Sequence, residues 1–181
     1  MLRSGGGREA AWTRGELAEQ LVGRAPALRR TAYLLCGDWN QAEDLVQTVF
    51  ANVYAARRRL RAREALGAYL RQALTRTYID ANARHWRREH VTAELPDRAA
   101  PGVDNIEDRL VLLDALAQVP PRQRACLVLR FYDDCSVEET ALTLDCSAGT
   151  VKSNTARGLE ALRAVLTDHV SDLIVSSRRK P

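Results

Sequence analysis

The regular spacing of apolar residues between positions 42 and 53 constrains the fold more than any other feature of this sequence. Apolar side chains recur there at intervals of three and four residues, which places them on one face of an α-helix: Ala42, Leu45, Val46, Val49, Phe50 and Val53. Asp38 precedes this run and is a suitable N-cap, because its short side chain can accept a hydrogen bond from a free backbone amide. The pattern predicts an amphipathic helix that packs against other helices.

Similar intervals predict further helices along the chain. One begins near Thr13 and continues past Pro26. Another has the apolar stripe Leu66, Leu70, Ala73, Thr77 and Ala81. Two more are expected at 106–119 and at 121–132, the latter with Tyr132 among its inward residues. No stretch alternates with period two for long, so we predict an all-α protein.

The stretch from Val91 to Asp104 interrupts this periodicity. It contains Pro96, Pro101 and Gly102 and has no apolar repeat, as is typical of a linker. We therefore predict two small helical domains joined by a flexible linker, the second containing a helix-turn-helix. The expected parts are a flexible N-terminal tail (1–15), a first domain (16–90), the linker (91–105), a second domain (106–166) and a C-terminal tail (167–181).

Positive charge is concentrated in one segment. The 181-residue chain has a formal net charge of +4, from 27 lysines and arginines against 23 acidic residues. Residues 57–88 alone contain ten arginines and only two acids, Glu64 and Asp80, which is a local net charge of +8. Such a dense cluster of cations favours a polyanionic partner.

The predicted helix in this basic segment carries a second stripe, opposite its apolar one. Its members are Arg71, Thr75, Tyr78, Asn82 and Trp86, followed by Arg87 and Arg88. Aromatic rings offer bases a stacking platform worth about 1–3 kcal/mol per base, and arginines follow the phosphate backbone. Single-stranded nucleic acid is therefore a candidate ligand. The alternative is that Tyr78 and Trp86 pack against another helix, and the residues by themselves favour neither.

The clearest motif in the C-terminal half is a helix-turn-helix. Ser136 and Glu139 form a capping box ahead of a short helix, Asp145 suits a tight turn, and Ser147 is the N-cap of a second helix. In this motif the first residues of the second helix meet base edges and phosphates in the major groove. Here they are Gly149, Thr150, Lys152, Ser153 and Asn154, with Arg157 one turn further on. Val151 is expected to point inward. The alternative is a generic surface hairpin of two helices.

Cysteine and histidine form no pattern typical of a metal site or a disulfide. The four cysteines, at 36, 126, 135 and 146, contain no CxxC pair, and the three histidines, at 85, 90 and 169, have no ligand-like spacing to them. We expect no metal, cofactor or catalytic residue. The longest uncharged run, Leu45–Ala56, is too short to span a bilayer, and no secretion signal is evident. We therefore expect a cytoplasmic protein without membrane insertion.

Several motifs resemble, in order and spacing, bacterial sigma factors of the extracytoplasmic-function (ECF) type, which are members of the sigma-70 family with regions 2 and 4 only. The region 2.2 pattern D-L-V-Q-x-x-F matches residues 44–50, and the A-W-L helix with its basic end matches 68–88. The region 4 patterns L-P-P-R-Q-R and L-x-L-R-Y-Y match 119–124 and 127–132. The pattern S-x-G-T-V-K-S, which opens the family's recognition helix, matches 147–153. The resemblance covers most of the chain.

The resemblance implies an alternative sigma factor. Such a protein binds RNA polymerase core, recognises the −35 and −10 promoter elements and promotes DNA melting, without covalent chemistry of its own. Asp44 and Gln47, which lie off the apolar stripe, would dock on the clamp helices of the polymerase β′ subunit, and region 4 would contact the β flap. The resemblance leaves open whether an anti-sigma factor binds.

The resemblance also implies how promoter DNA is divided between the two domains. Arg61 and Arg63 match the loop that captures a flipped base of the −10 element. The stripe from Arg71 to Trp86, with Arg87 and Arg88, would hold the melted strand. The recognition helix would read the −35 element as duplex. The chain departs from the family pattern there, with Asn154 in place of an arginine and Gly158 in place of an alanine.

Two other functions are compatible with parts of the sequence. One is a conventional helix-turn-helix regulator that binds duplex operators without acting as a polymerase subunit. The exposed positions of Asp44 and Gln47 and the stripe of arginines and aromatic residues argue against it. The other is an enzyme or metal protein that uses the cysteines and histidines, for which no ligand spacing is found.

Overall fold

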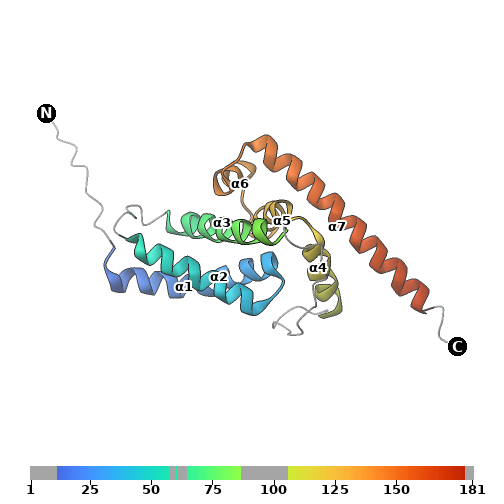
Figure 1. Ribbon diagram of the computed structural model, residues 1–181, viewed down its shortest axis with the longest axis horizontal. Coiled ribbons are helices and arrows are strands. Elements are labelled where there is room, and N and C mark those ends of the chain that lie inside the picture. The colour runs from blue at the N-terminus through green and yellow to red at the C-terminus, as the bar shows by residue number, and fades with distance from the viewer. Residues whose placement is uncertain (1–11, 58–59, 61–64, 87–105, 178–181) are drawn as a thin grey trace.

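The computed structural model describes residues 12–57, 60, 65–86 and 106–177, and these residues contain helices and no strand. The all-α prediction is therefore confirmed. The helices, in chain order, are α1 (Arg14–Cys36), α2 (Trp39–Ala55), α3 (Leu66–Trp86), α4 (Ile106–Gln118), α5 (Pro121–Leu127), the π-helical turn η2 (Val128–Tyr132), α6 (Val137–Leu144) and α7 (Ala148–Ser177). We call α1–α3 the N-terminal unit and α4–α7 the C-terminal unit (Figure 1).

Helices α1 and α2 form a hairpin whose ends are set by local sequence. Thr13 and Glu16 form a capping box at the start of α1, and Gly37 ends it with a left-handed φ of 79°. Asp38 then caps α2 by accepting a hydrogen bond from the Gln41 amide at 2.8 Å. The predicted apolar face of α2 is confirmed, since five of its six residues are buried and only Phe50 is partly exposed.

The range 1–15, predicted to be a flexible tail, includes the start of α1. Trp12 is buried in the hydrophobic core, and α1 starts at Arg14, within the range 1–15 that the sequence had placed in a flexible tail. The capping box explains the difference, because it satisfies backbone amides at the helix start and orders the chain there.

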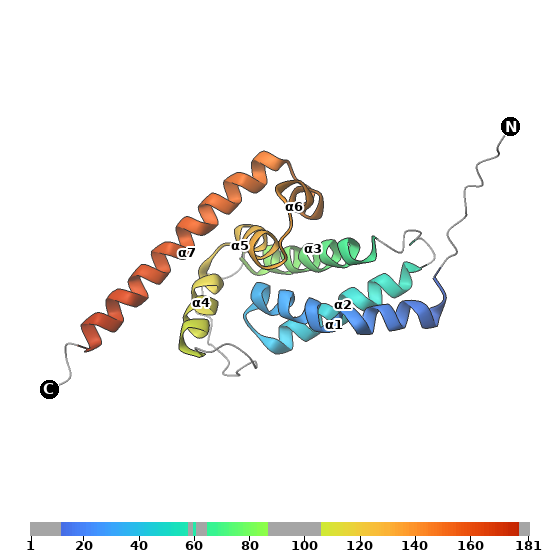
Figure 2. The same cartoon turned by 180° about the vertical axis from the view of Figure 1, so that it is seen from behind.

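Helix α3 buries only part of the predicted apolar stripe, Leu66 and Leu70, together with residues outside it. Its buried side chains are Leu66, Leu70, Leu74, Thr75 and Tyr78. The expected positions Ala73 and Thr77 are only partly buried, and Ala81 is exposed. The reason is that α3 lies between the α1–α2 hairpin on one side and α5 and α6 on the other, as both views show (Figures 1 and 2). A helix covered on two sides buries more than one stripe.

The C-terminal unit follows the predicted order of helices. Pro121 opens α5, the capping box of Ser136 and Glu139 opens α6, and Asp145 makes the turn to α7 with a left-handed φ of 51°. Two details differ from the expectation. Tyr132 is exposed and does not face the core, and α7 continues to Ser177, through most of the range 167–181 expected to be a C-terminal tail.

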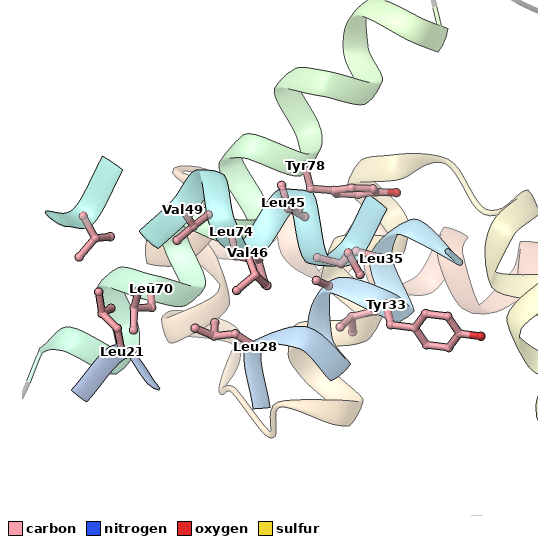
Figure 3. Close-up of a cluster of buried hydrophobic side chains, with 14 of the residues drawn as sticks. Leu21, Leu28, Tyr33, Leu35, Leu45, Val46, Val49, Leu70, Leu74 and Tyr78 are labelled. Carbon is pink, nitrogen blue, oxygen red and sulfur yellow. The ribbon is translucent and has the colours of Figure 1, made fainter. Parts of the chain in front are cut away.

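The two units share a hydrophobic cluster in this structure, although the sequence predicted two separate small domains, and the C-terminal unit also has a second, smaller cluster of Leu116, Val119 and Leu127. Leu113, Ala125 and Val128 of the C-terminal unit belong to the same buried cluster as the core residues of α1, α2 and α3. Figure 3 shows that part of this cluster, with Tyr78 of α3 among the leucines and valines of α1 and α2. The predicted linker, 91–105, lies outside the described residues. Within the part of the chain that is described, no helix has the length and apolar character needed to cross a membrane.

Candidate nucleic-acid interface

The first turns of α7, the second helix of the helix-turn-helix, carry a polar, cationic surface. Ser147 caps the helix, accepting a hydrogen bond from the Thr150 amide at 3.1 Å, and Val151 is fully buried as predicted. The six predicted duplex-contacting residues all lie on this part of α7. Gly149, Lys152, Ser153 and Arg157 are exposed, whereas Thr150 and Asn154 are half-buried. We call these six residues the duplex face.

Gly158 allows α7 to lie close against α5. A β-carbon at this position would meet the Leu127 side chain at 3.1 and 3.2 Å and the Gln123 β-carbon at 3.3 Å, which is tighter than ordinary van der Waals contact. The glycine costs about 0.5–1 kcal/mol of helix stability relative to alanine. The close packing of α7 on α5 compensates for this cost, because it holds the duplex face against the rest of the C-terminal unit.

The predicted strand-binding residues of α3 are not displayed as an open surface. We call Arg71, Thr75, Tyr78 and Asn82 the strand face. Thr75 is fully buried, and Tyr78 is only 2% exposed. Burial raises the pKa of the Tyr78 hydroxyl to about 12. The expectation of an exposed stripe is therefore wrong for this conformation, and the alternative, in which Tyr78 packs against other helices, is the arrangement observed.

The remaining members of that stripe are placed differently. Arg71 and Asn82 are half-buried, and the Asn82 side-chain amide donates a hydrogen bond to the Tyr78 carbonyl at 3.0 Å. Trp86 is the last residue of α3. Arg61, Arg63, Arg87 and Arg88, which were also predicted to contact the −10 element, lie outside the described residues.

Asp44 and Gln47 are both exposed on the outer face of α2, one turn apart, as their positions off the apolar stripe predicted. The Gln47 amide donates to Glu43 at 2.9 Å, and Glu43 forms an ion pair with Arg29 of α1 at 2.6 Å. The hydrogen bond from Gln47, followed by that from Arg29, lowers the pKa of Glu43. This outer face is therefore polar and solvent-accessible, as a protein-docking surface requires.

Sequence patterns did not indicate the side chains that join the two units. Arg124, on α5, is 7% exposed and donates to the Leu35 carbonyl of α1 at 2.7 Å. Thr31 of α1 donates to the Asp133 carboxylate at 3.0 Å, and Gln72 of α3 donates to the Leu142 carbonyl of α6 at 3.2 Å. A buried arginine resembles a surface arginine in sequence. The apolar run 125–129 that follows Arg124 is the only signal that this helix is deeply buried.

The cysteines are free thiols. Cys126 and Cys135 are buried, and desolvation raises the pKa of Cys126 to about 12 and that of Cys36 to about 11. Across the described residues, no group of three or more histidine, cysteine, aspartate or glutamate side chains is placed to hold a metal ion.

Comparison with known proteins finds one family model in each of the two units. The family model for sigma-70 region 2 matches residues 21–88, and that for sigma-70 region 4 matches residues 109–162. The RNA polymerase sigma-E factor of Streptomyces antibioticus is 38% identical over 156 residues, which is 83% of this chain and 84% of that protein. The ECF RNA polymerase sigma factor SigL of Mycobacterium tuberculosis is 31% identical, over 80% of this chain and 85% of its own length.

A sigma factor of known structure has a similar fold. The sigma factor RpoE of Bartonella quintana, in complex with the anti-sigma factor NepR, superposes with a TM-score of 0.70 and 25% identity over 84% of this chain and 97% of that one. These matches place a region 2 and a region 4 of the sigma-70 type in one short all-α chain. The protein belongs to the ECF group of sigma-70 family RNA polymerase sigma factors. The N-terminal unit contains its region 2 and the C-terminal unit its region 4.

Proposed function

We propose that this chain is an alternative sigma subunit that acts in the cytoplasm, brings RNA polymerase core to a set of promoters and catalyses no covalent step. The observation that carries the proposal is the exposed duplex face on the second helix of a helix-turn-helix, in a chain that also matches region 2. The NepR complex of the Bartonella relative makes an anti-sigma factor a candidate partner of this chain as well.

The outer face of α2 is the proposed contact with polymerase. Asp44 and Gln47 are exposed and adjacent, and we place them against the β′ clamp helices, while the C-terminal unit contacts the β flap. Reversing the charge with Asp44→Arg is expected to weaken binding to core polymerase at least tenfold, measured by fluorescence anisotropy of the labelled full chain. Binding of the same variant to duplex DNA should be unchanged, because α7 is untouched. An equal loss of polymerase binding and duplex binding contradicts the assignment of α2 to polymerase and α7 to DNA.

The duplex face is the proposed contact with the −35 element. Lys152 and Arg157 are its two cations, and each phosphate contact that is lost lowers the salt dependence of DNA binding. Lys152→Ala and Arg157→Ala should each weaken duplex binding and reduce the slope of log affinity against log salt by about 1. Arg163→Ala, an exposed arginine further along α7, is the matched control. Unchanged slopes for both test variants are incompatible with phosphate contacts at these positions.

The strand face of α3 is the proposed contact with the melted −10 element, together with Arg61, Arg63, Trp86, Arg87 and Arg88. Stacking of bases on Tyr78 requires a conformation in which this ring is uncovered, because the ring is buried here. Flipping a base out of the duplex costs a few kcal/mol, which stacking and pocket contacts can offset.

Run-off transcription of a genomic library with core polymerase and the purified full chain tests the function directly. We expect transcripts that start a fixed distance downstream of two recurring sequence elements, and none with core alone. A chain that binds duplex DNA but never associates with core or supports initiation is a conventional regulator, and that result overturns the proposal.

A further inference from the structure

We propose that Arg29 and Glu43 are positioning residues for the contact with polymerase: their ion pair holds the side chain of Gln47 in one orientation before polymerase binds. The inference rests on the proposed function, in which Asp44 and Gln47 dock on polymerase. It adds two residues, one of them on a different helix, that prepare this contact without making it. We call the linked side chains of Arg29, Glu43 and Gln47 the positioning network.

Two parallel contacts join Arg29 of α1 to Glu43 of α2. The Arg29 Nη2 donates a hydrogen bond to the Glu43 Oε1 at 2.9 Å, and the Arg29 Nε lies 2.6 Å from the Glu43 Oε2. The planar guanidinium thus meets both oxygens of the planar carboxylate. This two-point geometry fixes the carboxylate in position and in rotation, which a single contact would not do.

The stability of the hairpin does not account for this ion pair. The side chains of Arg29 and Glu43 are 43% and 40% exposed. Ion pairs that are exposed to this degree contribute little to the free energy of unfolding, because water competes for both charges and ordering two long side chains costs entropy. Buried apolar side chains, such as Leu28 and Val46, already hold α1 against α2. The feature that the pair does control is the orientation of the Glu43 carboxylate.

Glu43 in turn orients Gln47, which lies one turn further along α2. The Gln47 Nε2 donates to the Glu43 Oε1 at 2.9 Å, so this one oxygen accepts hydrogen bonds from Arg29 and from Gln47. The two hydrogen bonds lower the pKa of Glu43, which keeps the carboxyl group ionised at neutral pH. An ionised carboxylate can only accept hydrogen bonds. The Gln47 amide therefore turns its nitrogen toward Glu43 and its carbonyl oxygen away from it.

An orientation that exists before binding strengthens the contact with polymerase. Glutamine has a long, flexible side chain, and immobilising such a side chain at an interface costs binding free energy. Gln47 is exposed on the same outer face of α2 as Asp44, so nothing but the positioning network orders it among the described residues. Arg29 and Glu43 thereby reduce the entropy that Gln47 loses when polymerase binds.

The test measures binding of the labelled full chain to core polymerase by fluorescence anisotropy for Arg29→Met and Glu43→Ala. The first variant removes a positive charge and the second a negative charge, so electrostatics alone predicts opposite effects on affinity. Loss of positioning predicts weaker binding in both. The matched controls are Arg30→Met and Glu19→Ala, which make the same charge changes at exposed positions of α1. Circular dichroism verifies that each variant is folded.

A double-mutant cycle with Gln47→Ala distinguishes positioning from a structural role and from direct contact with polymerase. We expect Arg29→Met and Glu43→Ala each to weaken binding by about two- to tenfold, the range that corresponds to ordering one long side chain. In the Gln47→Ala background, the same two changes should alter the affinity by less than about twofold, because no amide is left to orient. Glu43→Ala keeps the test decisive if Arg29→Met fails to fold.

Three results overturn the inference. The first is that both variants bind core polymerase as tightly as the wild type. The second is that their affinities change in opposite directions, as those of the charge controls do. The third is that their losses persist undiminished in the Gln47→Ala background. Each of these results, with a wild-type chain that binds core polymerase, refutes only the positioning. A wild-type chain that does not bind core polymerase refutes the proposed sigma function itself.

Discussion

Tyr78 places a polar group in the core, near enough to Arg124 and Cys36 for both to influence its pKa. Its ring is 2% exposed, and its hydroxyl has no hydrogen-bond partner among the described residues. A buried hydroxyl without a partner costs about 1–3 kcal/mol of stability. Phenylalanine would fill the same space without a buried hydroxyl, so the hydroxyl opposes the folded state here.

We expect Tyr78→Phe to raise the free energy of unfolding by about 1 kcal/mol, measured by urea denaturation at pH 7. The exposed Tyr69, substituted in the same way, is the control and should change stability little. Loss of stability in Tyr78→Phe would show that the hydroxyl finds a partner in solution.

The same variant should change how the free energy of unfolding depends on pH in the alkaline range. The pKa of Tyr78 is raised from 10.0 to about 12 in the fold, so the unfolded chain loses this proton first and stability falls as the pH rises from 10 to 12. Tyr78→Phe removes the loss of stability that the titration of this hydroxyl causes. The part due to Cys36, whose pKa is raised from 9.0 to about 11, begins nearer pH 9 and remains.

At the scale of elements, the packing of α7 against α5 sets the orientation of the duplex face. The helix pair meets at Gly158, where the neighbouring Leu127 is itself buried. A larger residue must push the two helices apart or force Leu127 out of its rotamer, and overpacking of this kind costs about 1–3 kcal/mol.

Gly158→Val is therefore expected to lower the free energy of unfolding by about 1–3 kcal/mol and to weaken duplex binding. Gly23→Val, at an exposed position of α1 where an added β-carbon meets nothing within 4 Å, is the control that isolates the change in helix propensity from glycine to valine, which amounts to a few tenths of a kcal/mol. Thermal denaturation followed by circular dichroism compares the two. Equal stability of both variants would mean that α5 and α7 are not in close contact in solution.

At the scale of the whole molecule, the shared core couples the two units. Buried side chains of α4, α5 and η2 pack in the same cluster as those of α1–α3, so neither unit keeps its full core without the other. The tryptophans, at 12, 39 and 86, all lie in the N-terminal unit, whereas helices in both units contribute to circular dichroism.

We therefore expect a single unfolding transition in urea, with tryptophan fluorescence and circular dichroism at 222 nm giving the same midpoint. In Asp133→Arg the hydrogen bond from Thr31 of α1 to the Asp133 carboxylate is lost, and the two probes should separate if this weakens the packing between the units enough for each to unfold by itself. Two distinct transitions in the wild-type chain would show that the units are uncoupled before any contact is broken.

Features that depend on neighbouring residues could be predicted from the sequence. The apolar face of α2, the caps at Asp38, Ser136 and Ser147, the turn at Asp145 and the inward Val151 each require only a few consecutive positions. The family follows from motifs of the same kind. Asp44, Gln47 and four of the six duplex-face residues lie on exposed helix surfaces as predicted, for the same reason, whereas Thr150 and Asn154 are half-buried.

Features that depend on long-range packing could not be predicted in this way. The buried face of α3 was misjudged because helical periodicity identifies one stripe, whereas a helix between two layers buries more than one. Arg124 looked like a solvated cation, because nothing near it in sequence indicates the carbonyl of Leu35 that it binds. The continuation of α7 to Ser177 was likewise outside the motif that identified its start.

The sequence by itself determined the helices, their caps and the family, because hydrogen bonds and apolar periodicity within a helix involve residues that are close in the chain. Only the tertiary structure decided which surfaces are available. Tyr78 is buried in the hydrophobic cluster to which both units contribute, whereas Lys152 is exposed, and that cluster depends on packing between residues far apart in the sequence.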